Sequence, residues 1–168
     1  DMATTAAYLE RSRADAIVLL ELSPAQAQTL QALLPSYPYS YVEPSRMGAT
    51  VFTKWPVLSA ESLPLAKGGA TAARVQIDWR GTPVTVLGVH LNWPLGPRNS
   101  TFRNEELAGV VAFSKAQRQP LIVADTAGYP GWPAAVAPEA RSWAGAPIQR
   151  SRPTHATAWR KLGGSPEA

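Results

Sequence analysis

The sequence predicts an α/β fold with a mixed, twisted sheet, and three observations support this prediction. Segments with a helical spacing of apolar residues alternate with short apolar segments of strand length. Two of the apolar segments, 16–20 and 121–124, end directly in a carboxylate. Arg80-Gly81 joins two neighbouring strand-like segments and suits a hairpin turn. In sheets of this kind, ligands tend to gather at the strand ends.

The amino-terminal part predicts a helix, a buried strand and a second helix. We expect the first helix over residues 1–13, with Asp1 as its N-cap. The continuous apolar run 16–20 is typical of a central strand that is buried on both faces. Ser23-Pro24 supplies a cap and a first-turn proline for the next helix. The apolar stripe of that second helix comprises Ala27, Leu30, Leu33 and Leu34.

Strands dominate the middle of the chain. Tyrosines at alternate positions, from Tyr37 to Tyr41, predict a strand with a period of two. Residues 56–70 carry clusters of proline and glycine, so we expect them to be irregular. Further strands are expected over residues 47–53, 72–79 and 82–91.

The carboxy-terminal part predicts one long helix and one more buried strand. We expect the helix over residues 103–117, with Glu105 and Glu106 in its first turn, where the helix dipole favours carboxylates. The remaining expectations are a loop over residues 93–100, a strand over 121–125, and from Thr126 a loop-like segment with a short helix near 134–140.

The composition fits one folded domain, and we expect residues 1–168 to form it. The chain is 45% apolar and 17% charged, which is ordinary for a globular protein. It has no cysteine, which excludes disulfides, thiol nucleophiles and cysteine-based metal sites. The longest apolar run, 16–20, is far shorter than the roughly 18–20 residues of a membrane helix. No signal-peptide pattern is present, so we expect any targeting segment to lie outside this chain.

Charge and composition say little about partners or compartment. The net charge of +4 fits an anionic substrate and gives DNA a slight advantage, but ordinary surface charge for solubility is the favoured explanation. The richness in alanine and proline is typical of GC-rich bacterial genes.

Three polar residues, Glu21, His90 and Asp125, close apolar strands. If these strands are neighbours, the three side chains meet at one rim of the sheet. A pair of carboxylates can hold a hard cation such as Mg²⁺, and an imidazole can bind a phosphate oxygen or transfer a proton. The combination fits metal-assisted hydrolysis of a phosphate ester. Each residue also has a structural interpretation, because a strand-end acid can cap a turn and a strand histidine can be a hydrogen-bonded structural residue.

Aromatic and arginine side chains follow two of these strands. Trp93 and Trp132 can border the predicted site and stack on a base or sugar, or they can anchor loops by packing on proline. Arg98 and Arg103 can bind a phosphate, although Arg98 can also be interpreted as a solvated charge in a loop.

Five short motifs occur in a fixed order between residues 10 and 133. They are DAIVLLE (15–21), MGATVFTKWPV (47–57), VLGVHL with a following proline (86–94), the helix that begins at Arg103, and PLIVAD with a following proline (120–130). Their order and spacing resemble the motifs of the endonuclease/exonuclease/phosphatase superfamily, whose fold is of the deoxyribonuclease I-like type.

This resemblance implies a four-layer α/β sandwich, with mixed sheets flanked by helices. It also implies Mg²⁺- or Mn²⁺-dependent hydrolysis of phosphate esters, nucleic acids among them. By the same resemblance, Glu21 is the metal-binding acid, His90 contacts the scissile phosphate, and Asp125 binds or orients the nucleophilic water. Arg103 matches the arginine of the family's "R-x-x-Q-h" helix, and with Trp93 it completes the candidate substrate-binding residues.

The chain also departs from the family pattern. The family's "G-D-F-N" reads ADTA at residues 124–127, so Ala127 stands where an active-site asparagine is usual. The family's first strand and its closing Asp-His pair have no match, and His155 follows a "P-T" that resembles the segment before that pair. We therefore expect a domain that is incomplete at both ends, with exposed sheet edges unless another chain completes the sheet.

Three hypotheses follow. The first is a metal-dependent phosphodiesterase with a reduced site, and the second is a non-catalytic member of the same fold that serves in binding or assembly. The third is a fragment or a redesigned version of an active enzyme.

Overall fold

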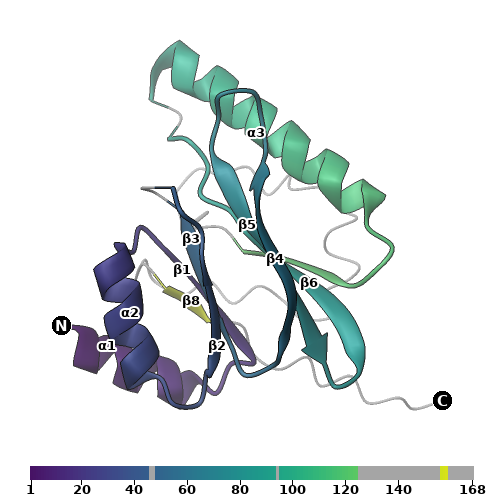
Figure 1. Cartoon of the computed structure of the whole chain (residues 1–168). Helices are drawn as coiled ribbons and strands as arrows, with labels where there is room; N and C mark the ends of the chain where they lie inside the picture. Colours follow the sequence, from purple (N-terminus) through teal and green to yellow (C-terminus); the bar gives the residue numbers. More distant parts are fainter. Residues whose placement is uncertain (46–47, 94, 125–155, 159–168) are drawn as a thin grey trace.

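The computed structural model describes residues 1–45, 48–93, 95–124 and 156–158, which form two sheets with helices on their outer faces (Figure 1). The helices are α1 (Met2–Ser12), α2 (Pro24–Leu33) and α3 (Gly96–Ala116). Sheet A has the strand order β2-β3-β1-β8 and comprises β1 (Ala16–Leu20), β2 (Tyr39–Val42), β3 (Ala49–Thr53) and β8 (Ala156–Ala158). Sheet B has the order β4-β5-β6-β7 and comprises β4 (Val57–Pro64), β5 (Thr71–Trp79), β6 (Thr82–Gly88) and β7 (Leu121–Ala124).

The elements stack in four layers, with α1 and α2 outside sheet A and α3 outside sheet B (Figure 1). The two sheets pack face to face through a core that includes Val18, Val51, Val75 and Val86. Among the described strands, every pair is antiparallel except β6 and β7, which run parallel on either side of the α3 crossover. The arrangement confirms the predicted four-layer α/β sandwich with mixed sheets.

The amino-terminal elements form as their sequence predicts. Asp1 caps α1 by accepting a hydrogen bond from the Thr4 backbone N–H at 2.8 Å. Ser23 and Gln26 form a reciprocal capping box at the start of α2. All five residues of β1 are buried, because α1 and α2 cover one face of the strand and sheet B covers the other. This double cover explains why the strand is continuously apolar.

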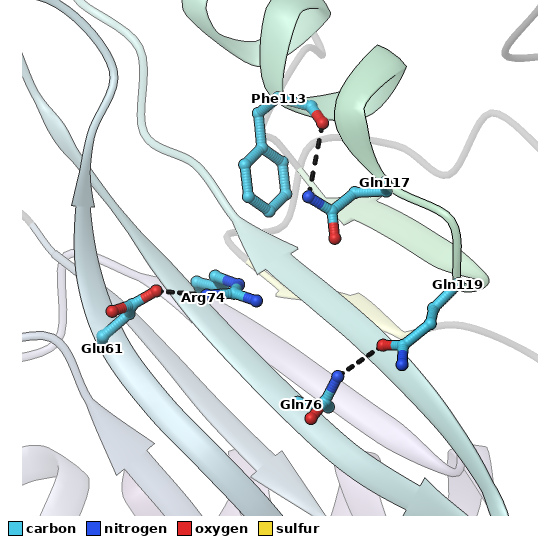
Figure 2. Close-up of polar contacts among 6 residues, drawn as sticks. All are labelled: Glu61, Arg74, Gln76, Phe113, Gln117 and Gln119. Carbon is cyan, nitrogen blue, oxygen red and sulfur yellow. Dashed lines mark hydrogen bonds and ion pairs between the residues drawn. The ribbon is translucent and has the colours of Figure 1, made fainter.

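Helix α3 lies along the outer face of sheet B. Its apolar side packs on Leu87 and Val89 through Leu107, Val110 and Phe113. Polar contacts between sheet B and the carboxy-terminal end of α3 add to this packing, as Figure 2 shows.

Arg74 of β5 forms an ion pair with Glu61 of β4, and its guanidinium lies 5.7 Å from the centre of the Phe113 ring (Figure 2). Gln76 of β5 donates to the side-chain oxygen of Gln119, just after the helix, at 2.5 Å. These contacts fix α3 against β5 at its carboxy-terminal half.

Two sequence-based expectations are wrong. Residues 56–70 are not irregular, because Val57–Pro64 forms β4, an edge strand of sheet B among the described residues. Most of its side chains are exposed, so its sequence carries no apolar pattern, while its backbone still pairs with β5 around a bulge between Val57 and Ser59. Residues 93–100 are not all loop, because α3 already begins at Gly96 with a proline in its first turn.

Smaller differences concern the ends of elements. Tyr37 does not belong to the predicted tyrosine strand; its ring is buried, and its hydroxyl donates to the Ala14 carbonyl at 2.9 Å. The strand expected over 82–91 ends at Gly88. The turn at Arg80-Gly81 is confirmed, with φ of 55° and 83° at the two residues. The expected helix near 134–140 lies outside the described residues.

In the part of the chain that the structure describes, no helix is both long and apolar enough to cross a membrane.

Candidate functional site

The candidate site lies beside a close contact between the two sheets. Gly88, the last residue of β6, faces sheet A, and a Cβ atom there would come within 2.8 Å of Ala49 Cβ and 2.9 Å of Val18 Cγ1. Ala73 is buried in the same core. Small residues at this end of the sandwich therefore let β1 and β6 meet at a shared rim.

Strand register brings the predicted residues to that rim. Leu20, the last residue of β1, pairs with Ala49 at the start of β3, so Glu21 leaves sheet A beside the Gly88 contact. β6 and β7 run parallel, with Gly88 opposite Ala124, so both strands end at the same edge. His90 follows the end of β6 by two residues.

Glu21 and His90 contact each other directly. Nε2 of His90 lies 3.2 Å from Oε1 of Glu21, so the structure joins a residue after β1 to a residue after β6. The Glu21 side chain is 45% exposed, whereas that of His90 is only 10% exposed. The carboxylate is thus open to solvent while the imidazole is largely enclosed.

The backbone at Glu21 is unusual. Its φ of 60° lies in the left-handed region, which costs a residue with a Cβ atom about 1 kcal/mol. The chain turns there immediately after the five buried residues of β1. Backbone strain of this kind clusters at functional sites.

Asp125 lies outside the described residues, as do Trp132, Ala127 and His155. The residue before Asp125, Ala124, is buried, and its carbonyl accepts a hydrogen bond from Val89 N–H at 2.9 Å. Among the described residues, no group of three acidic or histidine side chains is arranged to hold a metal ion. The described part of the site therefore consists of the Glu21–His90 pair.

The predicted substrate-binding residues lie on the elements that follow His90. Trp93 is on the same connecting segment, and its side chain is more than half exposed. Arg103 lies on α3 with its Nε atom shielded from solvent. Arg98 stacks on the Phe102 ring of the same helix, at 5.6 Å from the ring centre.

Glu106 departs most from expectation. It does not lie in the first turn of the helix, because α3 begins ten residues earlier, at Gly96. Its side chain is fully buried, and its carboxylate accepts hydrogen bonds from the backbone N–H groups of Ala70 and Asn92 and from the Asn92 side chain. The sequence carries one sign of this role: Glu106 lies four residues before Val110 and seven before Phe113, on the face that packs against sheet B.

Glu43 is a second buried carboxylate near this rim, at 3% exposure. Oε1 accepts hydrogen bonds from Ser62 and Thr71, both at 2.8 Å, and Oε2 accepts from the backbone N–H and the hydroxyl of Ser45. A Cβ atom on Gly48 would lie 2.1 Å from Oε2, so only glycine leaves room for this carboxylate. The cluster joins sheet A to β4 and β5.

Burial by itself raises the pKa of the Glu43 carboxyl, but hydrogen bonds from Ser45, Thr71 and Ser62 outweigh burial and hold the pKa below its ordinary value of 4.5. The folded state therefore favours the charged form. The resulting stabilisation is present above about pH 4.5 and is lost as the pH falls through the lower, folded-state pKa.

We expect Glu43→Gln to lower the free energy of unfolding at pH 7 by roughly 1–3 kcal/mol, because the amide leaves a buried donor without an acceptor. The loss should shrink in acid, because below about pH 4.5 the carboxyl group of the unfolded wild-type chain takes up a proton and the advantage of the charged form in the folded state declines. Urea unfolding at pH 7 and pH 3.5 measures both values. The exposed Glu105→Gln is the control, and an equal loss at the two pH values would contradict the interpretation.

Residues 1–160 match the model of the endonuclease/exonuclease/phosphatase family. The chain belongs to this family. A search of curated protein sequences finds no match.

Solved structures of the same fold agree with this membership. Sphingomyelinase C from Streptomyces griseocarneus is 23% identical, with a TM-score of 0.59 over 74% of this chain and 56% of that one. D. rerio TDP2 in complex with a single-strand DNA product is 21% identical, with a TM-score of 0.63 over 74% of this chain and 52% of that one. An endonuclease/exonuclease/phosphatase protein from Beutenbergia cavernae DSM 12333 is 21% identical, with a TM-score of 0.63 over 74% and 41%.

These similarities show that the chain has the deoxyribonuclease I-like fold. The chain spans between 41% and 56% of the length of these three structures. In the described part of the chain, the strand ends that carry Glu21 and His90 lie at one rim.

Proposed function

We propose that this family member is a metal-dependent phosphoesterase that hydrolyses phosphodiesters by attack of a water molecule on phosphorus. The observation that carries the proposal is the contact between Glu21 and His90 at the rim shared by β1, β6 and β7. An accessible carboxylate next to an enclosed imidazole is suited to binding a phosphate ester and the cation that accompanies it.

The residues present fit a bound Mg²⁺ or Mn²⁺. Mg²⁺ takes oxygen ligands and is commonly held by one or two carboxylates, with water and substrate oxygens completing its coordination. Glu21 offers such a carboxylate, which is nearly half exposed. When bound, the cation would neutralise charge that develops on the phosphate oxygens.

The other site residues receive complementary roles in this proposal. His90 donates a hydrogen bond to a phosphate oxygen and so holds the ester against the rim. Asp125, the residue after β7, orients the attacking water and accepts its proton. Arg103 supplies positive charge near the phosphate, and the exposed ring of Trp93 contacts the group attached to it.

A non-catalytic binding role is the second candidate, and Ala127 favours it. Alanine has no polar group with which to replace the asparagine that the family motif carries at this position. The loss of one member of a cooperating catalytic set usually costs several powers of ten in rate. In this second role, the rim binds a phosphate ester, nucleic acid included, without turnover.

The decisive experiment is hydrolysis of a panel of phosphodiesters: plasmid DNA, single-stranded RNA, sphingomyelin vesicles and bis-p-nitrophenyl phosphate. The panel is run with Mg²⁺ or Mn²⁺, with EDTA, and with metal added back after EDTA. His90→Ala, purified in parallel, controls for a contaminating hydrolase. Turnover that needs metal and is lost in His90→Ala supports the enzyme; no turnover above that variant favours the binding module.

A further inference from the structure

Glu106 connects α3 to the segment that carries His90. It lies near the middle of the helix, and its side chain is 0% exposed. A carboxylate in such a place is costly unless hydrogen bonds compensate for the lost hydration. The groups that donate hydrogen bonds to this carboxylate compensate for its burial, and Glu106 in turn holds these groups in place.

Both carboxylate oxygens are used, and they hold two segments. Oε2 accepts from the Asn92 backbone N–H at 2.8 Å, and the Asn92 side-chain amide donates to Oε1. Oε1 also accepts from the Ala70 backbone N–H at 2.7 Å. Asn92 is two residues after His90, and Ala70 directly precedes β5.

Regular pairing stops just before His90. β6 ends at Gly88, and Val89 N–H makes a backbone hydrogen bond to Ala124. Two residues after His90, the Asn92 backbone N–H donates to the Glu106 carboxylate and not to the carbonyl of a neighbouring strand. The histidine therefore lies between two fixed backbone points, one in sheet B and one on α3.

The surroundings of Glu106 are shaped for a carboxylate at this spot. A Cβ atom on Gly69 would lie 2.9 Å from Oε1 and 3.2 Å from Cγ of Glu106. Thr71, next to Ala70, donates to the other buried carboxylate, Glu43. The two buried acids thus hold consecutive residues at the start of β5, close to where Ala73 pairs with the end of β6.

We propose that Glu106 is a positioning residue that fixes the His90–Asn92 segment and thereby holds the His90 imidazole against Glu21. The role extends the proposed function, on which its catalytic consequence rests. The "R-x-x-Q-h" pattern that Arg103 begins has a glutamine at this position, where this chain has Glu106. In this chain three donors face the side chain, so a glutamine, whose terminal NH2 group is itself a donor, would place that group against either Asn92 N–H or the pair of donors at Oε1. One buried N–H would then be unpaired, and the segment would shift to satisfy it.

The test compares Glu106→Gln with Glu105→Gln, which makes the same chemical change on an exposed neighbour of the same helix. Tyr37→Phe is a second control, because it removes a buried hydrogen bond to Ala14 at the opposite end of β1 and lowers stability without touching the rim. Asn92→Ala removes only the side-chain hydrogen bond to Glu106 and keeps the backbone one, so it should change the surroundings of His90 less than Glu106→Gln does.

The primary measurement needs no substrate. The chain contains two histidines, so a His155→Ala background leaves the ring signals of His90 alone in a histidine-labelled NMR spectrum. In Glu106→Gln these signals should shift or split, while Glu105→Gln and Tyr37→Phe leave them unchanged. Unchanged His90 signals in folded Glu106→Gln, or the same change in Tyr37→Phe, would overturn the positioning role. If Glu106→Gln does not fold, the Asn92→Ala signals decide by the same criterion.

The second measurement is kinetic, with bis-p-nitrophenyl phosphate as the substrate. Misplacement of a catalytic group by about 1 Å can cost ~10²-fold in rate, so we expect kcat of Glu106→Gln to fall by tens to a hundredfold with KM little changed. If the wild-type protein shows no turnover, the proposed hydrolysis fails, and the NMR comparison still decides the role of Glu106.

Discussion

Replacing Glu21 with glutamine should reduce metal-dependent turnover of phosphodiesters by about three powers of ten or more, while leaving the fold intact. The amide keeps an oxygen that can accept the hydrogen bond from His90 Nε2, so the contact between the two residues survives. It removes the negative charge that a hard cation requires. The variant therefore separates metal binding from the positioning of His90.

Two measurements check this expectation. The rate at saturating Mg²⁺ gives the loss of turnover, and a titration of activity with Mn²⁺ shows whether the residual rate needs far more metal. Glu61→Gln is the matched control, because it neutralises an exposed carboxylate of β4 that pairs with Arg74. Turnover at the wild-type level in Glu21→Gln would remove Glu21 from the metal site.

The sequence could indicate Glu21 and His90 as candidate site residues because each lies at the end of an apolar strand. Glu21 and His90 each follow a run of apolar residues, and a polar residue in that position marks the place where a buried strand meets solvent. The rule works because strand direction and burial are local properties, visible within six or seven residues. That the two strands belong to different sheets is not a local property, so the sequence predicts the shared rim only on the condition that the strands are neighbours.

The part that sequence reasoning missed depends on contacts between distant residues. Glu106 was expected in a first helical turn, where a carboxylate is ordinary. Its partners lie 14 and 36 residues away, in segments without regular structure of their own. β4 was missed for a related reason: an edge strand with exposed side chains is held by its backbone hydrogen bonds, which leave no mark on the amino-acid pattern.

Gly109→Ala should destabilise the protein by about 2 kcal/mol or more, which is roughly 4–8 °C in Tm for a chain of this size. Helix propensity alone predicts the opposite sign, because alanine is favoured over glycine inside a helix by roughly 1 kcal/mol. A steric clash with Leu65 makes the expected change in stability unfavourable instead. A Cβ atom at position 109 would lie 2.0 Å from the Leu65 carbonyl oxygen and 2.9 Å from its carbon.

The clash cannot be relieved by a side-chain rotation, because the atoms that it meets belong to the backbone of the segment between β4 and β5. Ala112→Gly, on the exposed face of the same helix, measures the propensity term separately and should cost roughly 1 kcal/mol. Thermal unfolding of both variants gives the comparison. A Gly109→Ala variant as stable as the wild type would mean that α3 can withdraw from Leu65 at little cost.

A movement of α3 away from Leu65 would also affect the rim that carries Glu21 and His90. Gly109 lies one turn after Glu106, and Leu65 donates its backbone N–H to Ala70, whose own N–H binds the Glu106 carboxylate. A helix pushed away from Leu65 would draw Glu106 away from Ala70 and Asn92 as well. We therefore expect the Ala70 and Asn92 amides of Gly109→Ala to exchange faster with solvent than in the wild type. Unchanged exchange in a destabilised variant would show that the close packing at Gly109 supports the fold independently of the rim.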